Sequence, residues 1–195
     1  MNRIGLFVIL GILAALALFI LSGINTIPSR DEKVTAAWSQ VENQYQRRTD
    51  LVPNLIETVK GAANFEKSTL TEVINARANA TRVTLSPEML NDPEAMKRFE
   101  QAQGGLTTAL SRLMAVAEGY PNLKANQNFL SLQSQLEGTE NRISVARRDY
   151  IEAVQSYNTT VRTFPGLMWA KLYGASLKAN FTATPGSDKP PAVKF

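Results

Sequence analysis

The stretch that decides the fold runs from Val34 to Arg77 and includes AWSQV at residues 37–41, QRRTDLVPNL at 46–55 and VKG at 59–61. Its apolar residues recur at spacings built from three and four, which places them along one side of a helix. These residues are Val34, Trp38, Val41, Tyr45, Val52, Leu55, Val59, Ala62, Val73 and Ala76. An isolated helix cannot bury such a seam, so the pattern predicts partner helices elsewhere in the chain.

Two residues inside this stretch disfavour a straight helix. Pro53 lacks the backbone N–H that a helix interior uses, and Gly61 has a low helix propensity. We therefore expect one long helix with a bend or a local break near Asp50 and a second soft point at Gly61.

The segment Ile4–Ile24 is apolar throughout except for glycine and serine residues. At 1.5 Å per residue, about 21 residues cover roughly 30 Å, the thickness of a hydrocarbon core, so a transmembrane helix is predicted. A cleavable signal peptide is the competing interpretation, but its apolar region would be shorter. The ending LSGI at 21–24 resembles a lipoprotein signal in which Ile24 replaces the lipid-carrying cysteine. We interpret the segment as an uncleaved anchor.

The orientation of this anchor rests on few charges. Arg3 precedes the segment and Arg30 and Lys33 follow it, so the positive-inside rule hardly separates the two orientations. The lipoprotein-like ending favours a single-pass protein of the bacterial inner (cytoplasmic) membrane with its bundle on the periplasmic or outer side. Gly11 and Ala15 form a small-xxx-small pair through which two anchors could approach.

Capping signals mark the helix ends. Ser29 and Glu32 have the form of a capping box that would start the first long helix, the alternative being an anchor helix that continues with a kink at Pro28. Asp92 before Pro93 predicts the start of a second helix, and the residues from Gly119 to Pro121 predict its end. Its seam is Phe99, Gln103, Leu106, Leu110, Leu113 and Ala117.

A third helix is predicted to start after Asn122 or Asn126 and to end at residues 164–166, where Phe-Pro-Gly occurs. Its seam is Phe129, Leu132, Leu136, Thr139, Ile143, Ala146, Tyr150, Val154, Tyr157 and Val161. No stretch alternates with a period of two. The fold class predicted is all-α: an N-terminal transmembrane helix, then an elongated antiparallel, coiled-coil-like bundle of three long helices and a short C-terminal helix.

These patterns divide the chain into an anchor and exit at 1–28, a bundle at 29–165, a short amphipathic apolar segment at 166–182 and a disordered tail at 183–195. The apolar segment suits either a membrane interface or a protein contact. In a bundle of three helices the last helix leads away from the anchor. We therefore expect the segment at the far end, docked on the bundle or on another subunit.

Composition excludes several functions. The chain has 195 residues, is 44% hydrophobic and carries a net charge of +4, which suits one domain with a short membrane element. Basic and acidic residues are interleaved along the chain, so no basic element suited to nucleic acid stands out. The chain has no cysteine and no histidine, which excludes thiol nucleophiles, Cys/His zinc sites and Ser-His-Asp triads.

Five carboxylates are the remaining candidates for acid–base or cation-binding chemistry: Asp50, Glu57, Glu66, Glu140 and Asp149. Glu140 falls beside the seam of the third helix, where a carboxylate pairs more often with an arginine of another helix. Arg47 or Arg48 is the expected partner. We therefore assign no catalytic, cofactor-binding or metal-binding residue, and we expect no enzymatic activity and no cofactor.

Several motifs together resemble one family: DEKV at 31–34 with AW at 37–38, QRRTDLVPNL at 46–55 with ETVKG at 57–61, YPNLKA at 120–125, LEGTENRI at 136–143, and ARRDY at 146–150 with YN at 157–158 and FP at 164–165. The chain is similar over nearly all its length, up to about Gly174, to the LemA family of bacterial membrane-anchored helical proteins. The resemblance implies an N-terminal membrane segment and an elongated bundle of antiparallel helices. It supplies no catalytic residue or cofactor.

The function expected is that of a non-enzymatic scaffold or adaptor in the bacterial envelope. Its expected partners are the lipid bilayer, further copies of itself in a homo-oligomer and an unidentified envelope protein, with no nucleic acid. The alternative is a membrane-linked sensor or ligand-binding bundle that signals through a bend near Pro53.

Overall fold

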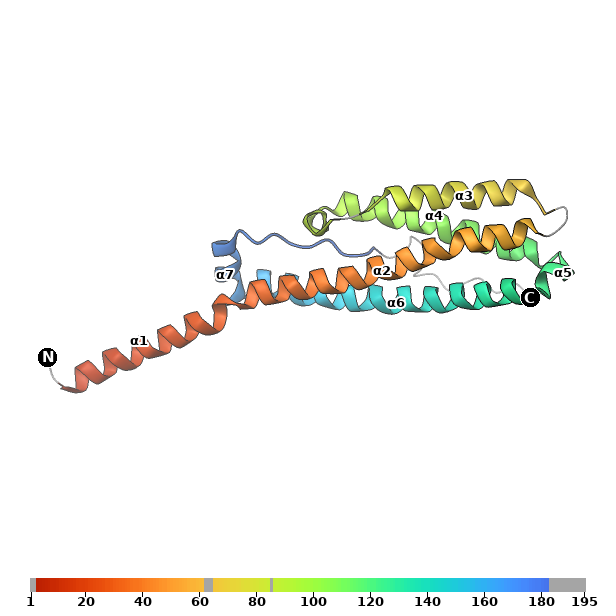
Figure 1. Cartoon of the computed structure of the whole chain (residues 1–195). Coiled ribbons are helices and arrows are strands. Elements are labelled where there is room, and N and C mark those ends of the chain that lie inside the picture. The colour runs from red at the N-terminus through yellow and green to blue at the C-terminus, as the bar shows by residue number, and fades with distance from the viewer. Residues whose placement is uncertain (1–2, 62–64, 85, 183–195) are drawn as a thin grey trace, which may run out of the picture.

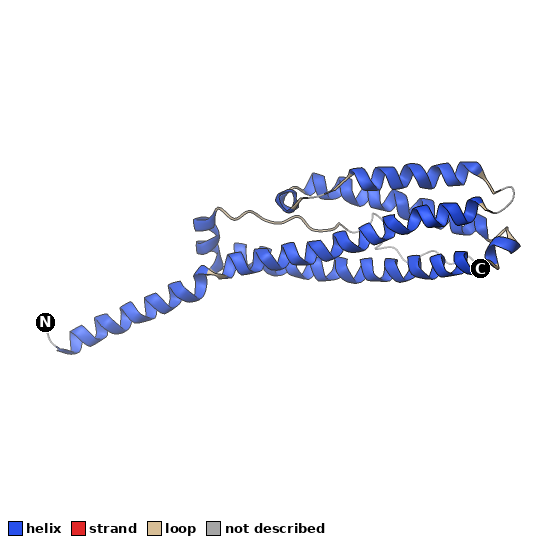
Figure 2. Cartoon of the chain, in the orientation of Figure 1, coloured by secondary structure: helices blue, strands red, loops and turns tan. Residues whose placement is uncertain are grey.

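The computed structural model of the chain describes residues 3–61, 65–84 and 86–182. Its elements are α1 (Arg3–Ile24), α2 (Thr26–Lys60), α3 (Lys67–Arg82), the 3-10 helix η1 (Pro87–Asn91), α4 (Pro93–Ala117), α5 (Pro121–Lys124), α6 (Gln127–Arg162) and α7 (Gly166–Tyr173). Throughout the described residues every regular element is helical (Figure 2), so the all-α prediction is confirmed. The tail predicted at 183–195 lies outside the described residues.

The bundle consists of four antiparallel helices, α2, α3, α4 and α6 (Figure 1). The chain leads away from α1 along α2, returns along α3, leads away again along α4 and returns along α6. α2 packs mainly on α6, and α3 packs mainly on α4. The pair formed by α2 and α6 extends beyond the other two helices at the end nearest α1.

The predicted bundle of three long helices is therefore wrong. The chain reverses between Lys60 and Lys67, which divides the predicted helix Val34–Arg77 into α2 and α3. Gly61 caps the end of α2. The seam spacing did not reveal the reversal because α3 buries its own residues at the same helical period, so the pattern resumes after the break.

Pro53 does not interrupt α2. The helix is continuous from Thr26 to Lys60 with Pro53 inside it, so the predicted local break near Asp50 is absent. Figure 1 shows α2 diverging from α6 towards its C-terminal end. The soft point at Gly61, by contrast, coincides with the end of the helix.

The helix starts follow capping chemistry at two of three predicted positions. The Asp92 side chain accepts a hydrogen bond from Glu94 N at 2.9 Å, and the Asn126 side chain caps α6. The capping box at Ser29 is wrong, because α2 already begins at Thr26. Pro28 is tolerated there since N–H groups in a first helical turn have no intrahelical partner.

The core forms two clusters along the bundle. The cluster near α1 centres on the buried Trp38, whose indole makes edge contacts with Phe99 and Tyr150, each at 5.2 Å between ring centroids. The second cluster lies towards α5 and joins mainly aliphatic residues of α2, α3, α4, α5 and α6, with Phe65 and Phe129. Arg48, Gln103 and Thr139 are buried as well, and they lie between the two clusters in the order of each helix.

The residues after α7 form an extended strap at 174–182 that follows the bundle back towards its middle (Figure 1). Ala179 N donates to Leu90 O at 2.6 Å, and the Tyr150 hydroxyl donates to Ala179 O at 2.9 Å. The Phe181 ring packs on Tyr150 with centroids 5.4 Å apart. The strap thus completes the core where α3 and α4 do not cover α2 and α6.

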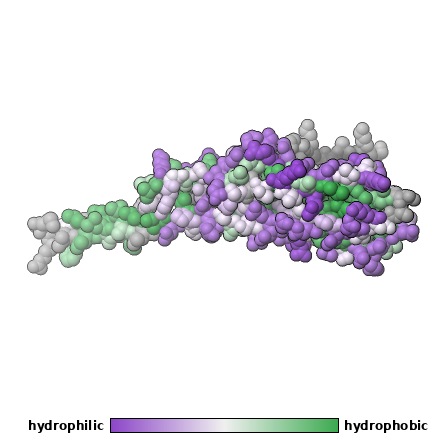
Figure 3. Space-filling view, turned by 45° about the horizontal axis from the view of Figure 1, so that its top comes forward, coloured by the Kyte–Doolittle hydropathy of each residue, from purple (hydrophilic) through white to green (hydrophobic). Residues whose placement is uncertain are grey.

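α1 continues from the α2 end of the bundle as a helix with exposed apolar side chains (Figure 3). Within the described residues, no helix is both long and apolar enough to cross a membrane. The transmembrane prediction for Ile4–Ile24 is therefore unconfirmed.

Tyr150 makes the stability of the bundle sensitive to alkaline pH. Burial raises the pKa of its phenol above the usual value of about 10. A raised folded-state pKa contributes stability that is fully present below the unfolded pKa and is lost as the pH rises through the folded one. We expect the free energy of unfolding to fall above pH 10 by up to about 1.4 kcal/mol per pH unit for this group.

The variant Tyr150→Phe tests this expectation. It should be about 1 kcal/mol less stable at neutral pH, because it loses the hydrogen bond to Ala179 O. Above pH 10 it should lose stability less steeply than the natural chain in denaturant titrations. Parallel alkaline slopes for the two proteins would contradict this role of Tyr150.

Candidate functional site

Arg48 is the most unusual residue of the bundle, because its side chain is buried and only 1% exposed. It occupies a seam position of α2, between Tyr45 and Val52. These two apolar seam residues are seven positions apart, and Arg48 and Thr49 occupy the seam position between them. This gap was the signal in the sequence for a polar layer in the core.

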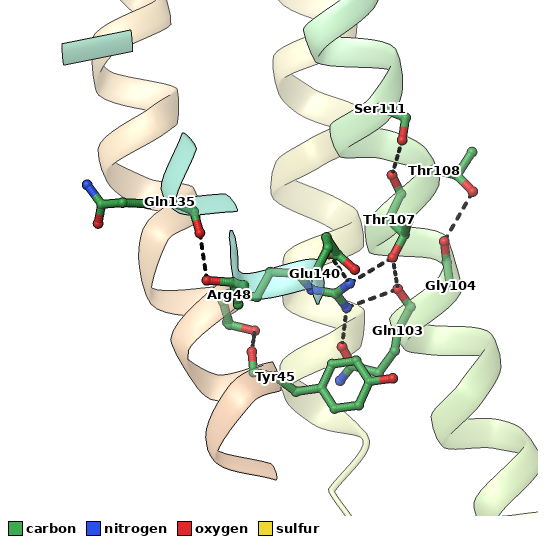
Figure 4. Close-up of polar contacts among 11 residues, drawn as sticks. Tyr45, Arg48, Gln103, Gly104, Thr107, Thr108, Ser111, Gln135 and Glu140 are labelled. Carbon is green, nitrogen blue, oxygen red and sulfur yellow. Dashed lines mark hydrogen bonds and ion pairs between the residues drawn. The ribbon is translucent and has the colours of Figure 1, made fainter. Parts of the chain in front are cut away.

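The Arg48 guanidinium joins three helices (Figure 4). Its Nη1 donates to Thr107 Oγ1 of α4 and to Glu140 Oε1 of α6, both at 2.7 Å. Its Nη2 donates to the backbone and side-chain oxygens of Gln103 at 3.2 and 2.7 Å. A buried charge with these partners is far less costly than an unpaired one. The predicted pairing of Glu140 with Arg47 or Arg48 is thus confirmed for Arg48.

Thr49, the residue after Arg48, connects α2 to α3, the remaining helix of the bundle. Pro53 has no N–H to donate to the Thr49 carbonyl, four residues earlier, so this carbonyl is free to accept from elsewhere. Arg77 Nε of α3 donates to it at 3.1 Å. Gln103 Nε2 also donates to Ala80 O at 3.3 Å, which links α4 to α3. We call Arg48, Thr49, Arg77, Gln103, Thr107 and Glu140 the arginine hub.

A groove of about 860 Å³ lies beside the hub between α4 and α6. Arg147 and Glu100 bridge it with a 3.3 Å ion pair, and the strap closes one side through Thr182 Oγ1, which donates to Glu100 at 2.7 Å. Lys97 and Arg148 add positive charge to the lining. The groove thus offers charges of both signs that are already largely engaged with one another.

Tyr45, which belongs to the core cluster near α1, lies against the hub. The Arg48 guanidinium carbon is 5.0 Å from the centre of its ring, a cation–π contact. Burial raises the pKa of the Tyr45 phenol, and the positive charges of Arg147 and Arg48 oppose this shift. The phenol therefore remains neutral at physiological pH and acts as a packing and hydrogen-bonding group.

The structure does not bring to the hub the other four carboxylates that the sequence offered as candidates for acid–base or cation-binding chemistry. They occupy exposed positions: Asp50, Glu57, Glu66 and Asp149. Their partners are close in the sequence: Gln46, Lys60, Ser68 with Thr69, and Arg148, respectively. Hydrogen bonds from Ser68 and Thr69 lower the pKa of Glu66. Among the described residues, acidic side chains do not gather in groups that could hold a metal ion.

The fold and the hub define an elongated helical bundle whose polar groups pair across the interior. The chain belongs to the LemA family: the model of that family matches residues 37–195. This match includes the hub, the whole second core cluster and all of the cluster near α1 except Ile27 and Val34.

Individual relatives share about a quarter of their aligned residues with this chain. Magnetosome protein MamQ 2 of Paramagnetospirillum magneticum is 27% identical over 182 residues, which cover 85% of this chain and 67% of the relative. Magnetosome protein MamQ of Magnetospirillum gryphiswaldense is 25% identical over a stretch of the same length. Protein LemA of Metamycoplasma hominis is 24% identical over 72% of this chain and 60% of its own length.

Removing the central guanidinium should destabilise the whole bundle. Arg48→Ala leaves Glu140, Gln103 and Thr107 without their shared donor, and we expect a loss of about 3–5 kcal/mol in the free energy of unfolding. Arg47→Ala is the matched control, because the neighbouring arginine is exposed, and should change stability by less than about 0.5 kcal/mol. Equal losses in urea titrations would refute a special role of Arg48.

A double-mutant cycle tests the link between Pro53 and Arg77. Arg77→Ala removes the donor to the Thr49 carbonyl and should destabilise the chain by about 1 kcal/mol. In a Pro53→Ala background the new N–H can donate to the same carbonyl, so the loss from Arg77→Ala should fall by half or more. Arg82→Ala, an exposed arginine at the end of α3, is the control. A strictly additive cycle would show that the two residues act independently.

Proposed function

We propose that this chain is a non-enzymatic, membrane-anchored helical scaffold or adaptor of the bacterial envelope that self-assembles. The observation that carries the proposal is α1, which projects from the bundle and has exposed large apolar side chains along its length. The exposed ones among its described side chains are Phe7, Ile9, Leu10, Ile12, Leu13, Leu16, Leu18, Ile20 and Ile24. In this proposal α1 enters the inner membrane and the bundle stands on the periplasmic or outer side.

The hub supports a structural role for the bundle. Its charges and amides are engaged with one another across the helices, so they hold the bundle together. The absence of cysteine and histidine from the sequence removes thiol nucleophiles and imidazole acid–base groups. The relatives named magnetosome proteins also favour participation in a larger cellular structure over the turnover of a soluble substrate.

Membrane fractionation tests the anchor. The full chain, produced in a bacterium, should remain in the membrane pellet after alkaline washing. Replacing Leu13 and Leu16 together by arginine should release it, because a charge at the centre of a membrane helix costs about 2.5–3.5 kcal/mol. Leu130→Arg, on an exposed position of α6, should leave the chain in the pellet. Equal recovery of all three proteins in the soluble fraction would contradict the anchor.

Mass measurement tests self-assembly. The purified chain in mild detergent should form particles of more than one chain by light scattering, and their mass should fall on dilution. A strictly monomeric particle at every concentration would refute the assembly part of the proposal and leave the anchor intact.

The groove beside the hub favours a second candidate function, a sensor or ligand-binding bundle. Its lining joins α2, α4 and α6, so an occupant would contact helices whose relative positions could change. A bound ligand would raise the melting temperature of the chain, and above Kd the stabilisation would grow with the logarithm of the ligand concentration. An unchanged melting temperature across a broad ligand screen would remove the support for this candidate.

A further inference from the structure

α7 lies beside the end of α1, not at the far end of the bundle where the sequence placed it (Figure 1). The expectation is wrong because α3 adds a reversal, so α6 returns towards α1. The Tyr173 hydroxyl donates to Ile24 O at 2.8 Å. The Trp169 indole packs so closely on Gly23 that a Cβ there would overlap it. α7 is thus held at the junction of α1 and α2.

The amphipathicity of α7 is the reverse of that of an ordinary surface helix. Its buried positions are Gly166 and Ala170, which pack on the bundle as small residues. Gly166 lies so close to Thr160 O that no side chain would fit. Whereas the large Trp169 packs inwards, five other large apolar residues of α7 and its flanks are exposed: Phe164, Leu167, Met168, Leu172 and Leu177. We call these five residues the α7 face.

The exposure of the α7 face matches that of α1. Phe164 is 73% exposed and Leu172 71%, against 70% for Phe7 and 68% for Leu18 of α1. A surface helix in water normally turns its large apolar residues inwards. An apolar face of this kind marks a site of contact with a membrane or with another protein.

We infer that the α7 face is a second membrane contact, which lies in the headgroup region of the bilayer at the point where α1 leaves the bundle. The inference rests on the proposed membrane anchor. Its support is continuity, because α7 touches α1 and presents the same kind of surface directly beside it. Trp169 and Tyr173 at this junction belong to the residue types that concentrate at membrane interfaces. Lys171 is exposed on the same helix and suits anionic headgroups.

This second contact would orient the bundle. Only Asn25 separates α1 from α2, so an anchor alone would leave one narrow connection to set the tilt of the bundle. The Lys178–Asp31 ion pair at 2.8 Å fastens the segment after α7 to α2. Lipid contact at both α1 and α7 would therefore hold α2 and α6 at a fixed angle to the membrane. The hub would then lie in the part of the bundle that projects from the membrane surface.

Site-directed spin labelling tests the inference directly, since the chain has no natural cysteine. Single variants Leu172→Cys and Met168→Cys carry the label on the α7 face. Leu13→Cys reports on the anchor, and Leu130→Cys is the matched control, an exposed leucine near the opposite end of α6. The full chain is reconstituted into vesicles of phosphatidylcholine and phosphatidylglycerol. Power saturation then compares the access of oxygen with that of a water-soluble nickel complex.

Labels at 172 and 168 should show high oxygen and low nickel access, at a depth of about 5–10 Å below the headgroup surface. The label at 130 should show the opposite. If the labels at 172 and 168 are in water while that at 13 is in lipid, the second contact is refuted and the anchor stands. A label at 13 in water refutes the anchor whatever the other labels show.

A protein contact gives a different result. Dipolar broadening between labels at 172 that persists in detergent without lipid would identify the α7 face as an interface between copies of the chain. That outcome would overturn the lipid assignment. Unchanged thermal unfolding of the cysteine variants, expected because the substituted side chains are exposed, shows that the labels report on the native fold.

Discussion

The structure depends on the buried guanidinium of Arg48. A charge in the core is stable only where opposite charge and hydrogen-bond acceptors meet it, and here these come from α4 and α6. The adjacent Thr49 carbonyl, left without a helical donor by Pro53, accepts from Arg77 of α3. Two consecutive residues of α2 therefore fix the positions of the other three bundle helices. A polar layer of this kind also sets the register of a bundle, because any sliding would leave the charge unpaired.

This arrangement has a consequence at the end of the bundle near α1. Four antiparallel helices bring the chain back to its starting point, so the start of α2 and the end of α6 lie together, and Arg30 hydrogen-bonds to Ser156. The return of α6 places α7 beside α1, and the strap then fills the part of the core that α3 and α4 leave uncovered. One reversal of the chain thus decides where the exposed apolar surface of the C-terminal segment lies.

The sequence predicted the helical class, the seams of α4 and α6, the Asp92 cap and the pairing of Glu140 because each depends on local spacing or on a simple charge rule. It left the start of α6 open between Asn122 and Asn126, and the structure selects Asn126. It did not predict the reversal before Lys67, since helical periodicity is the same on both sides of it. Pro53 suggested a break, whereas a carbonyl satisfied from another helix allows α2 to continue. Such contacts between distant residues have no signature in local sequence. The predicted position of α7 at the far end of the bundle depended on a count of three helices. It was wrong because the bundle has four.

The distance between the start of α2 and the end of α6 tests the account most directly. Spin labels are attached at Glu32→Cys and Arg162→Cys, both exposed positions, in the full chain. Pulsed electron paramagnetic resonance then measures the distance between the two labels. The four-helix arrangement predicts a distance below about 30 Å, because both residues lie at the α1 end of helices that rise about 1.5 Å per residue. A distance near 50 Å, about the length of α2 at that rise, would place the end of α6 at the opposite end of the bundle and contradict the account.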